Sequence, residues 1–130
     1  MAFISEHKGL AAAAAVGLFV WFAISAATGR GEAWDHSAYW GLGFPVLMIS
    51  CAILGWYFPE GAWRLGLTAS IVQVIPLTIA GGSLGLLPFG IVVLAVIGLP
   101  LSLAAFLAAR ARVRRDLRSV RDELRHKSRR

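Results

Sequence analysis

The stretch IVVLAVIGLPLSLAAFLAARARVRR, residues 91–115, joins a long apolar segment directly to a run of arginines. No charged side chain occurs in it before Arg110, and an uncharged apolar segment of roughly 20 residues can cross the hydrocarbon core of a bilayer. Pro88 suits the first turn of a helix, whereas Pro100 is expected to kink one. We therefore expect a membrane-spanning helix over about residues 87–109, which ends where the arginines begin.

The segment that follows, residues 110–130, is predicted to continue the same helix as an amphipathic tail. It contains no glycine or proline, and Arg118/Asp122 and Glu123/Lys127 have the i, i+4 spacing of charge pairs that support helices. Ten basic residues against three acidic ones give the tail a net charge of +7, compared with +6 for the whole chain. A narrow apolar stripe with nearly heptad spacing is formed by Phe106, Val113, Leu117, Val120 and Leu124.

Three further apolar segments precede this helix, at about residues 9–28, 39–58 and 64–80. The 130 residues are 58% hydrophobic, which is more than a soluble domain of this size can bury in one core. We therefore predict an all-α fold. Residues 1–109 should form an integral membrane bundle of four transmembrane helices, and residues 110–130 a basic cytoplasmic tail helix.

The first apolar segment has a second interpretation, as a cleaved signal peptide. Lys8 precedes an alanine-rich core, and the small residues 25–27 resemble a cleavage site. However, the bulky Phe19 and Trp21 lie late in the segment and make its core longer than is typical of cleaved signals. We expect this segment to remain in the protein as the first span.

The distribution of basic residues predicts the orientation in the membrane, because short cytoplasmic loops are enriched in lysine and arginine. The tail holds ten basic residues, the loop around Arg30 holds one, and the turn at Gly81 holds none. With four spans, Lys8 and Arg64 fall on the same side as the tail. We expect a multi-pass protein of a bacterial cytoplasmic (inner) membrane, with the N-terminus and the C-terminus both cytoplasmic.

The third span is the most polar of the four, and its side chains are the candidate site within the membrane. Apart from Arg64 at the first position of the third segment, no Asp, Glu, Lys, Arg or His lies in any span, which disfavours ion-coupled transport. Polar residues in lipid normally face other helices, so helix–helix contact is the favoured interpretation, and a polar pathway near Pro76 is the alternative. The candidates are Thr68, Ser70, Gln73 and Thr78.

Enzyme chemistry is not predicted. Glu32, Asp35 and His36 share a loop and have metal-ligand chemistry, but no second cluster completes a site, and no serine lies in a nucleophile elbow. Cys51 lies in an apolar run and is interpreted as a small packing residue. We expect no metal, no cofactor and no catalytic residue.

The tail arginines are the candidate contacts for anionic lipid headgroups or a protein partner, because they begin where the fourth span ends. Each is worth about 1 kcal/mol near an anionic leaflet. The tail has no aromatic residue on which bases can stack, so nucleic-acid binding is not expected. The candidates are Arg110, Arg112, Arg114, Arg115, Arg118 and Arg121.

The function expected from the sequence is that of an accessory or scaffold subunit, which acts through helix packing and its tail. Its expected partners are the lipid bilayer and another membrane protein or further copies of the chain. A small oligomeric channel or transporter with a polar path near Gln73 is the alternative, and a lipid enzyme ranks third.

Small residues four apart mark candidate helix contacts. These pairs are Ala13/Gly17, Cys51/Gly55, Gly66/Ser70 and Ala104/Ala108.

Overall fold

The computed structural model describes residues 2–29, 33, 36–81, 85 and 87–129, which form helices and connecting turns without a strand. This confirms the all-helical prediction. The helices are α1 (Ala2–Thr28), the π-helix η2 (Tyr39–Gly43), α2 (Phe44–Tyr57), α3 (Trp63–Ile71), α4 (Val74–Gly81) and α5 (Leu87–Ser128).

Three helical segments are long and apolar enough to cross a membrane: His7–Thr28, Tyr39–Tyr57 and α5. They coincide with three of the four predicted spans. The predicted span over residues 64–80 is instead divided at Val72 and Gln73 into the short helices α3 and α4. A fourth helix of membrane-spanning length is therefore not confirmed for residues 64–80.

Pro76 accounts for this division. It has no N–H to donate to the carbonyl of Val72 four residues earlier, and its ring crowds that carbonyl. The Val72 carbonyl accepts a hydrogen bond from the Ile75 N–H at 3.1 Å, and the Gln73 N–H donates to the Ser70 carbonyl at 3.1 Å. These i to i+3 bonds tighten the backbone into a turn and separate the two helices.

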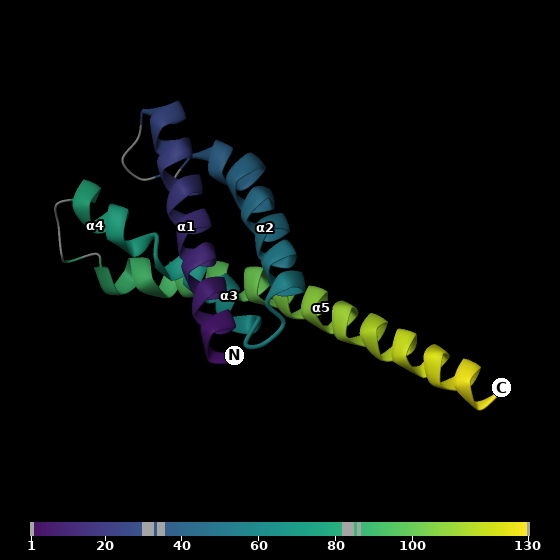
Figure 1. Cartoon of the computed structure of the whole chain (residues 1–130). Helices are drawn as coiled ribbons and strands as arrows, with labels where there is room; N and C mark the ends of the chain where they lie inside the picture. Colours follow the sequence, from purple (N-terminus) through teal and green to yellow (C-terminus); the bar gives the residue numbers. More distant parts are fainter. Residues whose placement is uncertain (1, 30–32, 34–35, 82–84, 86, 130) are drawn as a thin grey trace.

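Helix α5 contains Pro100 and yet continues without interruption from Leu87 to Ser128. It packs most extensively on α2 and α3, while α1 packs on α3 and α2. Figure 1 shows α1 and α2 side by side, with α5 crossing them steeply and its last turns extending beyond the bundle. The same view shows α3 near the N-terminus and α4 at the side of the bundle, next to the first turns of α5.

Glycines lie at the closest approaches between helices. A Cβ added at any of three of them would lie 2.1 Å from a backbone atom of the facing helix. The three contacts are Gly17 of α1 against Ala69, Gly55 of α2 against Ala105, and Gly66 of α3 against Ser102. Close backbone approach at small residues is the usual way in which helices associate in lipid.

The small-residue pairs on α1, α2 and α3 therefore lie at helix contacts, but the pair expected on α5 does not. Ala105 and Ala109 are buried there, whereas Ala104 and Ala108 are half-buried. The contact face of α5 is shifted by one residue. Because alanine is frequent along this helix, spacing alone does not distinguish the two registers.

Candidate functional site

Gln73, the most polar side chain of the divided third segment, is fully buried. The Tyr39 hydroxyl donates a hydrogen bond to Gln73 Oε1 at 2.9 Å, and Gln73 Nε2 donates to the Ala69 carbonyl at 3.3 Å. Tyr39 belongs to the π-helix η2, so this pair joins the two irregular backbone segments of the bundle. Both side chains are used for contact between helices.

The other three polar candidates are not gathered around Gln73. The Ser70 hydroxyl is buried and donates to the Leu94 carbonyl, which links α3 to α5. The Thr78 hydroxyl donates to the Val74 carbonyl of its own helix. Thr68 faces a surface groove between α1 and α3. The four residues therefore occupy separate environments and do not form a common polar path among the described residues.

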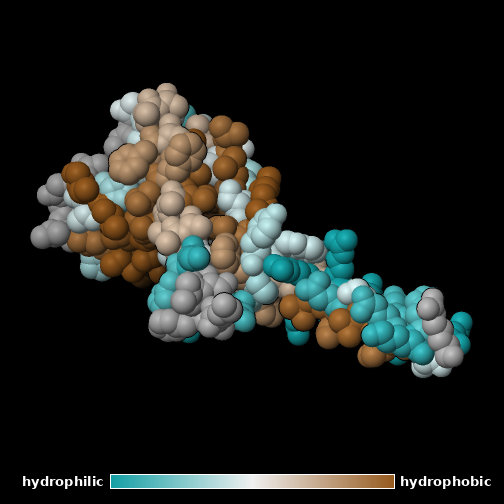
Figure 2. Space-filling model, viewed as in Figure 1, coloured by the Kyte–Doolittle hydropathy of each residue, from teal (hydrophilic) through white to brown (hydrophobic). Residues whose placement is uncertain are grey.

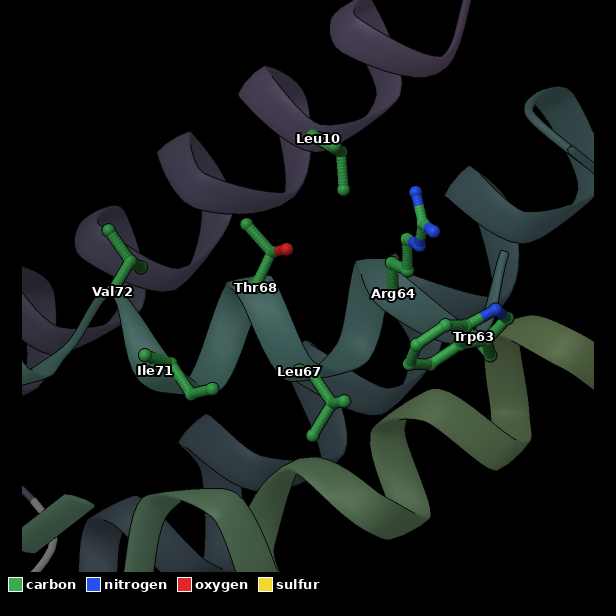
Figure 3. Close-up of a pocket in the computed structure, with 7 residues that line it drawn as sticks. All are labelled: Leu10, Trp63, Arg64, Leu67, Thr68, Ile71 and Val72. Carbon is green, nitrogen blue, oxygen red and sulfur yellow. The ribbon is translucent and has the colours of Figure 1, made fainter. Parts of the chain in front are cut away.

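The groove beside Thr68 is open and mostly apolar, with a volume of about 480 Å³. Leu10 of α1 forms one wall, and α3 together with Val72, which follows it, supplies the remaining lining residues. Figure 3 places Trp63 and Arg64 together at one end of the groove, and the Arg64 guanidinium lies 5.3 Å from the centre of the Trp63 ring. The groove therefore combines apolar walls with a tryptophan and an arginine at one end.

The first tail arginines contact the bundle. Arg112 Nη1 donates hydrogen bonds to the carbonyls of Trp56 at 2.6 Å and Tyr57 at 3.1 Å. These carbonyls belong to the last turn of α2, where a cation is favourable because of the helix dipole. The Arg110 guanidinium lies 5.2 Å from the centre of the Phe106 ring. The bundle therefore holds α5 firmly as far as Arg112.

Beyond Arg112, α5 leaves the bundle. Every residue from 113 to 129 is exposed, including the predicted contacts Arg114, Arg115, Arg118 and Arg121. The apolar stripe is exposed with them: Val113 by 47%, Leu117 by 65%, Val120 by 53% and Leu124 by 62%. Figure 2 shows hydrophobic side chains along one edge of this projecting helix and hydrophilic ones over the rest of its visible surface.

Of the three loop residues with metal-ligand chemistry, the structure describes only His36. His36 Nδ1 accepts a hydrogen bond from the Ala38 N–H at 3.0 Å, and no group of three His, Cys, Asp or Glu side chains is found among the described residues. Glu32 and Asp35 lie outside the described residues. Tyr39, the partner of Gln73, was not singled out from the sequence, because it lies 34 residues away in the chain.

Comparison with known proteins found no family model, no curated protein and no solved structure that matches the chain.

Proposed function

We propose that this chain is a non-enzymatic accessory or scaffold protein of a bacterial cytoplasmic membrane, in which the bundle anchors a docking helix. The observation that carries the proposal is the exposure of every residue from 113 to 129 on a helix that the bundle holds at Arg112. An exposed helix with one apolar edge and a strong positive charge is suited to recognising another macromolecule.

The proposed topology has four crossings, with α3 and α4 together forming the third. A divided helix is tolerated at membrane depth where its free backbone groups are satisfied by neighbours, as they are at Val72 and Gln73. This arrangement puts the N-terminus, the turn at Glu60 and the tail on the cytoplasmic side, in agreement with the positive-inside rule. The arginines at the start of the tail then lie at the level of the anionic headgroups.

The positive charge of the tail indicates that its partner has a negatively charged surface. Beyond the bundle, Arg118 and Arg125 are both exposed and lie seven residues apart, on one side of the helix. An acidic surface on a cytoplasmic protein is the matching partner, since complementary charge steers association and fixes orientation. We do not expect nucleic acid to bind, because the tail offers no aromatic platform.

Affinity purification in mild detergent tests this function, with the tag at the N-terminus and proteins identified by mass spectrometry. We expect the full chain to capture a specific partner, which a chain truncated after Arg115 loses. Truncation there keeps Arg112 and its bonds to α2, so the bundle should elute and melt as the full chain does.

Two point variants serve as a matched pair in the same purification. Arg118→Glu/Arg125→Glu should lose the partner at least tenfold, whereas Arg118→Lys/Arg125→Lys should keep most of it. Capture that is unchanged by both the truncation and the charge reversal would rule out the tail as the docking element.

A polar pathway through the bundle is the second candidate function. Two features favour it: the division between α3 and α4, and the π-helix η2. Discontinuous helices often form the solute sites of membrane transporters, and π-helical segments often occur at functional sites. The bonds of Gln73 to Tyr39 and Ala69 weigh against it, since they occupy the side chain that would line the path. We therefore rank this function below the scaffold.

A further inference from the structure

We propose that the apolar edge of the tail is covered by the same edge of other copies of this chain, in a parallel coiled coil. The steps along Val113, Leu117, Val120 and Leu124 are four, three and four residues, which is the alternation of a heptad repeat. In this register Leu117 and Leu124 occupy a positions, and Val113 and Val120 occupy d positions.

The same register continues along the part of α5 that lies in the bundle. Its apolar a and d positions there are all exposed, between 39% and 61%. They are Phe89, Val92, Val96, Leu99, Leu103 and Phe106, and the charged residue that follows them at an a position is Arg110. The buried residues of α5, such as Leu94, Leu101 and Ala105, lie on another face and hold α2 and α3. A second copy can therefore approach along α5 without disturbing the bundle.

The charges beside the stripe specify the direction of pairing. The e positions are Arg114 and Arg121, and the g positions are Asp116 and Glu123. In a parallel coiled coil, a g residue meets the e residue five positions later in its neighbour, so Asp116 faces Arg121 of the other copy. An antiparallel pair would instead place arginines against arginines and carboxylates against carboxylates. Copies anchored in one membrane with the same topology are also necessarily parallel.

Most of the remaining positive charges lie away from the contact: Arg118 and Arg125 are at b positions, and Arg115 and Arg129 are at f positions. Arg110 at an a position and Lys127 at a d position lie on the seam, one at each end of the four apolar tail positions, and basic residues there reduce the stability of the pairing. Asp116 is exposed and its carboxylate lies 3.8 Å from Arg112 Nε, an i, i+4 pair that is weak in water. Asp116 can therefore exchange this contact for an intermolecular one at little cost.

A lipid surface fits the stripe less well than a second copy does. Helix α5 has no glycine or proline after Pro100 and is continuous to Ser128, so the tail has no hinge at which it could bend away from the rest of α5 onto a lipid surface. Leu124 lies fifteen residues beyond the last buried residue, Ala109, or about 22 Å along the helix axis.

Two heptads are short for a free coiled coil, but membrane anchoring raises the effective concentration of the strands. Leucine at a with a β-branched residue at d favours three or four strands.

Cysteine cross-linking of the full chain in its membrane tests this inference. In a Cys51→Ala background, Leu117→Cys and Leu124→Cys each place a thiol at an a position. Ser119→Cys and His126→Cys provide controls with the same spacing at c positions. We expect mild oxidation to link Leu117→Cys and Leu124→Cys chains each to itself, at least tenfold faster than the controls, because facing a positions meet disulfide geometry.

Charge variants give a second measurement on the same chains. Asp116→Arg and Arg121→Asp should each slow the cross-linking of Leu117→Cys severalfold, and the two together should restore it. Equal cross-linking at all four cysteine positions, or at none, would overturn the proposal. So would linkage of Leu117→Cys chains to Val120→Cys chains in preference to each other, because an antiparallel coiled coil sets a positions against d positions.

Cysteine cross-linking would give a different result if a lipid surface, and not a second copy, covered the apolar stripe. In that case, Leu117→Cys would stay unlinked and be protected from a water-soluble thiol reagent in vesicles of anionic lipid, but not in vesicles of phosphatidylcholine. The inference rests on the proposed function in that both use the projecting tail. If the full chain captured no partner while its cysteine variants cross-linked as expected, only the proposed function would be contradicted. If the full chain captured a partner while the cysteine variants did not cross-link, only self-association would be contradicted.

Discussion

Gly66→Ala is expected to destabilise the bundle by about 3 kcal/mol and to reduce strongly the recovery of folded protein. The added methyl would lie 2.1 Å from the Ser102 nitrogen and 2.3 Å from the Leu101 carbonyl carbon. Both are backbone atoms of α5, so no side chain can rotate away to make room. α3 and α5 would have to separate, and the hydrogen bond from Ser70 to the Leu94 carbonyl lies in the same contact.

Thermal unfolding in detergent, followed by size-exclusion chromatography, measures this effect. Gly41→Ala is the matched control, because a Cβ at Gly41 meets nothing within 4 Å. We expect the control to melt within a few degrees of the parent chain, since it changes a helical glycine at an exposed position. Similar melting of the Gly66→Ala and Gly41→Ala chains would show that α3 and α5 are not packed this closely.

Gln73→Leu is expected to lower the free energy of unfolding by about 1–3 kcal/mol. The substitution leaves the buried Tyr39 hydroxyl without its acceptor and removes the bond to the Ala69 carbonyl. Tyr39→Phe removes only the first of these bonds and should cost about 1 kcal/mol, within the range measured for hydrogen bonds between membrane helices. The double variant should be little less stable than Gln73→Leu alone.

A double-mutant cycle of unfolding in mixed micelles gives the coupling between these two side chains. Additive losses would mean that Tyr39 and Gln73 do not interact. The same Gln73→Leu chain distinguishes the two candidate functions. If it remained assembled but abolished a solute flux that the parent chain supports, the polar pathway would be favoured over the scaffold.

Hydropathy and length were sufficient to locate the three long membrane-length helices, because the pattern of apolar residues there is uninterrupted. They were not sufficient for residues 64–80, where the division depends on one backbone hydrogen bond that Pro76 cannot make. Proline within an apolar run was visible in the sequence. Pro100, however, lies inside a helix that remains continuous, so proline alone does not distinguish the two outcomes.

The partners of the polar residues were beyond prediction for a related reason. Ser70 and Gln73 were expected to contact other helices, and the structure gives each such a bond. Their partners, Leu94 and Tyr39, depend on how the helices cross, and this is fixed by the glycine contacts. Arg112 was predicted only as a contact for headgroups or a partner, whereas the structure shows it bound to the end of α2.

Membrane topology tests the central claim, that an anchored bundle presents its tail to the cytoplasm, most directly. In the Cys51→Ala background, single cysteines can replace Ser37, Glu60, Gly85 and Ser128 and be treated with a membrane-impermeant maleimide. We predict that the cysteines at 37 and 85 react in sealed right-side-out vesicles, and that those at 60 and 128 react only after the vesicles are opened. Reaction at 128 but not at 85 in sealed vesicles would mean three crossings and an external tail, which would contradict the proposed scaffold.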